Sequence, residues 1–129
     1  MHTDPLRVLI SDEERALLFS LSNYLTFRGC QVDCTERLAD AQALVHHLHY
    51  DVVVVGLRAD ELARVRELAA DLRGLNHPTR VVALAPKSVD SESSAMREAR
   101  RGLLPVDRVI ERDLPLAELA RTICSALVD

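Results

Sequence analysis

The chain has 129 residues, of which 48% are hydrophobic and only 3% aromatic, and its formal net charge is −4. This length favours one globular domain with an aliphatic core, and the acidic balance argues against a direct nucleic-acid binder, which usually carries a basic excess. No apolar run approaches the ~20 residues of a membrane helix, and the three cysteines show no metal-like spacing. We therefore expect a single cytoplasmic domain over residues 1–129, without a cofactor and without membrane contact.

Strand-like and helix-like segments alternate along the whole chain. Each expected strand is a short apolar run, and each is followed by a segment with apolar residues at helical spacing. Ser11 and Glu14 fit a capping box at the first helix, and Gly29 fits the left-handed residue that often ends a helix. In chain order, the expected strand–helix pairs are 7–11 and 12–29, 30–34 and 36–49, 51–57 and 59–74, 80–85 and 91–102, and 107–111 and 114–128.

Five strand–helix units in succession predict an α/β fold of the (βα)5 type. The strands should be parallel and the helices should cover both faces of the sheet, because parallel crossovers place helices there. The valine run 52–55 suits the central strand. Ligands of such folds bind at the carboxyl ends of the strands, which directs attention to residues 11–14, 56–60, 85–88 and 111–113.

At these four places the sequence resembles the receiver domain of bacterial two-component response regulators. The resemblance extends over essentially the whole chain. "VLISDEE" resembles the first strand with its acidic pair, and "DVVVVGL" resembles the third strand, which normally ends in the phosphorylated aspartate. "RVVALAP" resembles the fourth strand, and "DRVIERDLPLAEL" resembles the fifth strand, the Lys–Pro step and the last helix. The resemblance implies a flavodoxin-like, doubly wound fold with a five-stranded parallel sheet in the order 2-1-3-4-5. Because an output domain often follows a receiver, residues 1–129 also fit the N-terminal part of a longer regulator.

The sequence departs from the receiver pattern at the positions that carry the chemistry. Gly56 stands where the family has the phosphate-accepting aspartate, and Ala85 stands where it has a hydroxyl. Arg112 replaces the lysine, and Val109 replaces the switch aromatic on the fifth strand. Phosphoryl transfer to a side chain needs an activated acceptor in line with the donor. The departures together predict a pseudo-receiver that is not an enzyme and that acts as a phosphorylation-independent protein-interaction module.

The acidic pair Asp12 and Glu13 is retained and allows two interpretations. The two carboxylates are weak candidates for a metal site, because a hard cation such as Mg²⁺ prefers more oxygen ligands than they supply. Alternatively they pair with Arg112, whose planar guanidinium suits carboxylates. Our hypothesis is that Arg112 fills the emptied pocket and fixes the domain in one state.

Two other functions remain open on the sequence alone. The domain could be a receiver that is phosphorylated at an unconventional residue in a phosphorelay, for which Asp60 is nearer than Asp51 at the opposite end of the strand. It could also be a small-ligand-binding α/β domain. Against this last alternative, no glycine-rich dinucleotide motif or P-loop follows any expected strand.

Basic residues gather in the expected fourth helix and fifth strand, namely at Arg97, Arg100, Arg101 and Arg108. Arg97 and Arg101 are four residues apart and therefore lie on one helical face. They form either a solvated charged face or an electrostatic docking surface for an acidic protein partner or a second copy of the chain. The resemblance places such a surface on the fourth helix, the fifth strand and the fifth helix.

The three cysteines are expected to be small apolar fillers of the core. Cys30 and Cys34 are both assigned to the second strand, where a spacing of four places them on one face. Cys124 belongs to the last helix, beside Ile123. Free cysteine behaves as a small hydrophobic residue when it is buried.

Overall fold

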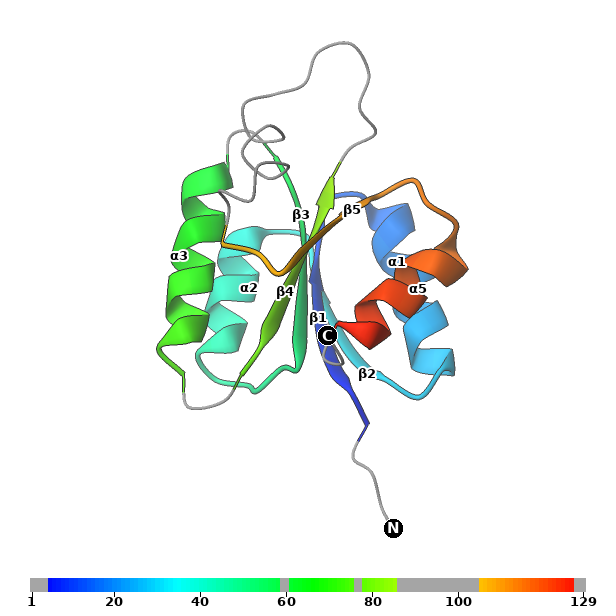
Figure 1. The fold of residues 1–129 in the computed structure, drawn as a ribbon, viewed down its shortest axis with the longest axis horizontal. Helices are drawn as coiled ribbons and strands as arrows, with labels where there is room; N and C mark the ends of the chain where they lie inside the picture. Colours follow the sequence, from blue (N-terminus) through cyan, green and yellow to red (C-terminus); the bar gives the residue numbers. More distant parts are fainter. Residues whose placement is uncertain (1–4, 59–60, 76–77, 86–104, 127–129) are drawn as a thin grey trace.

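Five parallel strands form one sheet in the order β2-β1-β3-β4-β5 (Figure 1). The computed structural model describes residues 5–58, 61–75, 78–85 and 105–126 of the chain. The strand order is the one that the resemblance implies, so the predicted doubly wound fold is confirmed. The strands are β1 (Arg7–Ser11), β2 (Gln31–Thr35), β3 (Val52–Gly56), β4 (Arg80–Ala85) and β5 (Arg108–Glu111).

Helices cover both faces of this sheet, with α1 and α5 on one side and α2 and α3 on the other (Figure 1). The expected fourth helix, 91–102, lies outside the described residues. None of the helices in the described ranges is long and apolar enough to cross a membrane. The helices are α1 (Arg15–Phe27), α2 (Leu38–Val45), α3 (Leu62–Arg73) and α5 (Leu116–Ser125).

The central strand β3 is buried on both faces, as its run of valines predicts. Val53 and Val55 pack toward α2 and α3, whereas Val52 and Val54 pack toward α1 and α5, and all four are fully buried. Burying one such side chain contributes roughly 1.5–3 kcal/mol relative to leaving it exposed. Because successive valines of β3 point to opposite faces, the strand packs against both helical layers. The carboxyl edge of the sheet carries the site.

The start of α1 differs from the expected capping box. Helix α1 begins at Arg15, and its N-cap residue Glu14 makes no side-chain capping bond. Instead, the backbone N–H of Glu14 donates to Oδ1 of Asp12 at 2.9 Å. The end of the helix follows the prediction, because Gly29 has a φ of 96°, a conformation that favours glycine. The side chain of Asp12 thus fixes the turn before α1, and the N-cap is Glu14, not the expected Ser11.

Candidate functional site

The carboxyl ends of four strands meet at one edge of the sheet and bring together residues that are distant in sequence. The register pairs Ser11 of β1 with Val55 of β3, and Ala85 of β4 with Glu111 of β5. Asp12 follows β1 directly, Gly56 ends β3, and Arg112 follows β5. The topology therefore places Asp12, Gly56, Ala85 and Arg112 around one point, as expected for this class of fold.

Asp12 is a buried carboxylate held from several sides. Its side chain is 1% exposed, and Oδ1 accepts a hydrogen bond of 2.7 Å from the Arg112 guanidinium in addition to the Glu14 backbone bond. The backbone N–H of Asp12 donates to the carbonyl of Thr35 at 3.1 Å. Oδ2 has no hydrogen-bond partner among the residues that the structure describes. A buried charge is tolerated only when it is paired, so Arg112 is the contact that keeps Asp12 in place.

The carboxylate of Asp12 lies in the space that a side chain at position 56 would need. A Cβ atom built on Gly56 would lie 2.9 Å from Cγ of Asp12 and closer still to Oδ2. Gly29 is the only described glycine with a positive φ, so no left-handed backbone conformation requires glycine at position 56. The absence of a side chain on Gly56 is what makes room for Asp12.

Arg112, which follows β5, contacts Asp12 at the end of β1. Its backbone N–H donates to the carbonyl of Ala85 at 2.9 Å, which fixes the residue at the edge of β4. The same guanidinium nitrogen that binds Asp12 also contacts Oε2 of Glu14 at 2.9 Å. The side chain is 21% exposed, so water screens this pair only in part. The expected pairing of Arg112 with Asp12 is present in the structure.

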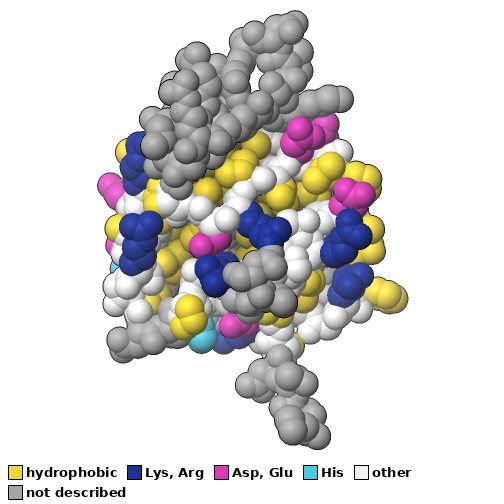
Figure 2. All heavy atoms as spheres, viewed as in Figure 1, with side chains coloured by type: hydrophobic (Ala, Val, Ile, Leu, Met, Phe, Trp, Pro, Cys, Tyr) yellow, Lys and Arg dark blue, Asp and Glu magenta, His cyan; other side chains and the backbone are white. Residues whose placement is uncertain are grey.

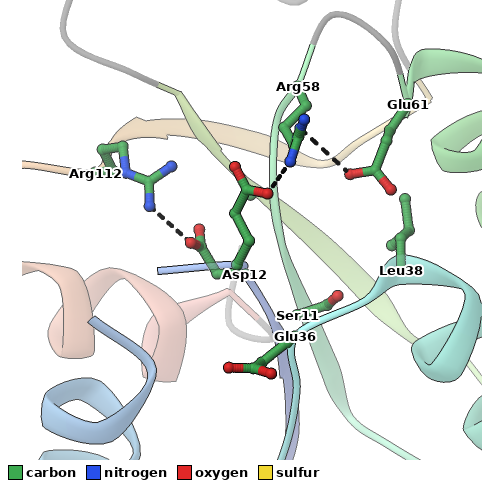
Figure 3. Close-up of a pocket in the computed structure, with 9 residues that line it drawn as sticks. Ser11, Asp12, Glu36, Leu38, Arg58, Glu61 and Arg112 are labelled. Carbon is green, nitrogen blue, oxygen red and sulfur yellow. Dashed lines mark hydrogen bonds and ion pairs between the residues drawn. The ribbon is translucent and has the colours of Figure 1, made fainter. Parts of the chain in front are cut away.

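Glu13 pairs with a different arginine, and its expected pairing with Arg112 is wrong. Glu13 contacts the guanidinium of Arg58, which also lies 3.9 Å from Glu61 (Figure 3). The chain bends at Glu13 after β1, and the side chain of Glu13 is 57% exposed whereas that of Asp12 is 1% exposed. Arg58 was not singled out in the sequence, although its place two residues after β3 puts it at the carboxyl edge.

The space left between these ion pairs is small. The cavity has a volume of about 10 Å³, which is close to the room that one water molecule requires. Arg112 and Arg58 approach it from opposite sides (Figure 3). The lining residues are Ser11, Asp12, Glu13, Glu36, Leu38, Gly56, Arg58, Glu61 and Arg112.

The described part of the chain offers no ready metal site. It contains no group of three or more His, Cys, Asp or Glu side chains that could hold a metal ion. At the carboxyl edge, Asp12 and Glu13 turn toward different arginines. A hard cation requires several converging oxygen ligands, and an arginine beside each carboxylate opposes its approach.

Three further candidate residues lie on β4 and β5, and of these only Ala85 is at the carboxyl end of its strand. Ala85 is 3% exposed, and Val109 is half-buried against the core on the α2 and α3 side. Arg108 is half-buried at the start of β5. Ala85 presents only a methyl group, and Val109 has no aromatic ring that could change position.

Several candidate residues lie elsewhere. Asp51 is at the opposite end of β3, where its carboxylate accepts the backbone N–H of Arg7 at 2.9 Å. This bond gives Asp51 a structural role far from the cavity. The candidate residues that lie outside the described ranges are Asp60, Arg97, Arg100 and Arg101.

Comparison with solved structures gives matches along nearly the full chain. A response regulator from Thermotoga maritima superposes with a TM-score of 0.76 at 17% identity, covering 97% of this chain and 99% of that one. An orphan response regulator of H. pylori gives a TM-score of 0.71 at 21% identity, with 98% and 99% covered. An atypical orphan response regulator, described as having a phosphorylation-independent regulatory mechanism, gives 0.74 at 22% identity, with 95% and 96% covered.

The chain has the fold of a response-regulator receiver domain. No protein-family model matches the sequence, and no curated protein matches it. The receiver fold accounts for the position of the cavity at the carboxyl edge of the sheet. What fills this edge in the present chain is set by its own residues, above all by Asp12, Gly56 and Arg112.

Removing the guanidinium of Arg112 should destabilise the domain. In Arg112→Ala the buried carboxylate of Asp12 loses its charged partner, so we expect the free energy of unfolding to fall by about 2–4 kcal/mol. Urea unfolding followed by circular dichroism measures this change. The matched control is Arg15→Ala, which breaks the exposed ion pair with Glu36 and should cost less than about 1 kcal/mol. Equal losses in the two variants would contradict the role given to Arg112.

Proposed function

We propose that this domain is a pseudo-receiver: a receiver-like signalling module that acts through protein–protein contacts and without a cycle of aspartate phosphorylation. It would work in the cytoplasm, in a pathway of the two-component type, as a binding domain and not as an enzyme. The receiver fold supports the signalling role. The residues at the carboxyl edge of the sheet support independence from phosphorylation.

The observation that carries this proposal is the occupancy of the space above Gly56. The resemblance assigns position 56 to the acceptor, and here the carboxylate of Asp12 lies where that side chain would begin. Arg112 holds Asp12 there. Phosphoryl transfer depends on a nucleophile in line with the donor and on stabilisation of the transferring group. Position 56 supplies no nucleophile, and a cavity of about 10 Å³ leaves no room for a phosphoryl donor in line with one.

One structural neighbour supports the same function. The atypical orphan regulator with the phosphorylation-independent mechanism shares the fold of this chain at 22% identity. It illustrates that a receiver fold can serve regulation without phosphate. The proposal for the present chain rests on its own site residues and takes the neighbour as a precedent.

The two alternative functions find less support in the described residues. Among the residues that line the cavity, another acceptor carboxylate would be Asp12, Glu13, Glu36 or Glu61, each of which already pairs with an arginine. Asp60 stays a candidate from the sequence alone. Binding of a small organic ligand at the carboxyl edge would need far more room, because ligand pockets usually measure about 300–1,000 Å³.

The absence of phosphorylation can be tested directly. Incubation of the purified chain with acetyl phosphate and Mg²⁺ should leave its intact mass unchanged, because position 56 supplies no acceptor atom. A receiver that has its acceptor aspartate, treated in parallel, should gain about 80 Da, the mass of one phosphoryl group. A gain of that size on the present chain, mapped to a carboxylate by peptide sequencing, would replace the proposal with the phosphorelay alternative.

The partner surface that we propose comprises β5, α5 and the basic segment that contains Arg97, Arg100 and Arg101, with Arg108 at its edge. Among the strands that the structure describes, β5 pairs only with β4 and lies at one edge of the sheet. Figure 2 shows the side of the molecule that carries β5 and α5, where basic, acidic and apolar side chains stand close together. A mixed, partly basic surface of this kind suits an acidic protein partner or a second copy of the chain.

Charge reversal should abolish binding at this surface. The double variant Arg97→Glu and Arg101→Glu would repel an acidic partner, so capture in a pull-down and self-association in sedimentation velocity should both be lost. The matched control reverses Arg64 and Arg73, two exposed arginines of α3 on the other side of the sheet, and should bind normally. Unchanged binding by the Arg97 and Arg101 variant would rule out this surface.

A further inference from the structure

Two cysteines meet between the helices that cover one face of the sheet. Cys30 lies between α1 and β2 and is 8% exposed, and Cys124 lies in the last turn of α5 and is half-buried. Cys30 belongs to the apolar cluster between α1 and α5, and Cys124 packs against this cluster. The expectation that these two residues fill the core is confirmed, whereas Cys34 is exposed on the edge strand β2 and the same expectation is wrong for it.

The Sγ atoms of Cys30 and Cys124 are 4.0 Å apart although the residues are 94 positions apart in sequence. A disulfide bond measures 2.03–2.05 Å, so the sulfurs would need to approach by about 2 Å. Cys30 lies in a connection, and Cys124 is one residue from the end of α5. Because both residues stand at the ends of elements, this approach displaces little of the regular backbone.

We propose that Cys30 and Cys124 are a modification site at which a peroxide forms a reversible disulfide, which locks α5 to the connection between α1 and β2. The proposal is independent of phosphorylation, because neither cysteine lies at the carboxyl edge of the sheet. The disulfide would fix the position of α5 relative to the segment that follows α1. An element of the proposed partner surface, α5, becomes covalently joined through its last turn to the segment that follows α1.

The order of the chemical steps follows from exposure. Burial, together with the neighbouring Cys124, raises the pKa of the Cys30 thiol to about 11, which disfavours its thiolate, the form that reacts with oxidants. Cys124 is the more exposed of the two residues, so we assign it as the sulfur that reacts first with a dissolved peroxide. Cys30 then acts as the resolving thiol, helped by its fixed position next to Cys124.

The reaction balances with hydrogen peroxide as the oxidant. The sulfur of Cys124 attacks one peroxide oxygen, the O–O bond breaks, and water leaves after proton transfer, which gives a sulfenic acid on Cys124. The sulfur of Cys30 then attacks the Cys124 sulfur, the S–O bond breaks, and the hydroxyl leaves as a second water with the Cys30 proton. Two thiols and one peroxide thus become one disulfide and two waters, and the two electrons lost by sulfur reduce the peroxide.

The experiment is a peroxide titration of the full, previously reduced chain. After quenching with N-ethylmaleimide, we expect an intact mass lower by about 2 Da before the alkylation increments are counted, one alkylated cysteine in place of three, and a Cys30–Cys124 cross-linked peptide. Oxidation should raise Tm by roughly 5–10 °C, because the bond closes a long loop in the unfolded chain. Dithiothreitol should reverse both changes.

Matched variants separate this site from the third cysteine. Cys34→Ser removes the exposed thiol and should leave the cross-link and the Tm rise intact, whereas Cys124→Ser should abolish both. The peptide map of the wild-type chain decides the matter even if a variant folds poorly. Peroxide oxidation that stops at a sulfenic or sulfinic acid, or a disulfide that contains Cys34 and leaves Cys30 and Cys124 unlinked, would overturn the proposal.

Discussion

The ion pair between Arg112 and Asp12 determines how the carboxyl edge of the sheet is filled. Asp12 follows β1 and is nearly fully buried, so its charge needs a partner, and Arg112 supplies it at 2.7 Å from the end of β5. β1 and β5 are separated in the sheet by β3 and β4, so the pair spans the strand that ends at Gly56. Glycine at that position gives the Asp12 carboxylate its room. The ion pairs of Glu14 and of Glu13 are arranged around this contact.

A switch needs two states that differ in free energy by only a few kcal/mol and an input that favours one of them. At this edge the input that the receiver fold suggests, a phosphoryl group, meets an arginine–carboxylate contact and a cavity of about 10 Å³. Breaking a buried pair is expensive because it leaves an uncompensated charge. On this account the carboxyl edge favours one arrangement of the domain, and we propose that regulation acts instead through the surface around β5 and α5 and through the thiol pair Cys30 and Cys124.

The fold could be predicted because its sequence signals are local and repeated. The pairing of individual side chains could not be predicted from the sequence. Four consecutive valines mark a strand buried on both faces, and the topology rule places Asp12, Gly56 and Arg112 at one edge without any knowledge of side chains. The choice between Glu13 and Glu14 as the second partner of Arg112 depends on which way each residue points after β1. The same carboxylate of Asp12 displaced the expected capping box by accepting the Glu14 N–H. The contact of Cys30 with Cys124 depends on how α5 is rotated against α1, which the spacing of apolar residues does not specify.

The most direct test of this account is a double-mutant cycle between positions 56 and 12, read by urea unfolding. In the wild-type background, Gly56→Ala should lower the free energy of unfolding by about 1–3 kcal/mol, because the methyl group enters the space of the Asp12 carboxylate. In the Asp12→Ala background the same change should cost nothing or stabilise the domain slightly, because alanine is favoured over glycine in a strand. Gly74→Ala is the control, since its Cβ would meet no atom closer than 3.5 Å. An equal cost of Gly56→Ala in both backgrounds would contradict the claim that Asp12 occupies the place of a side chain at position 56.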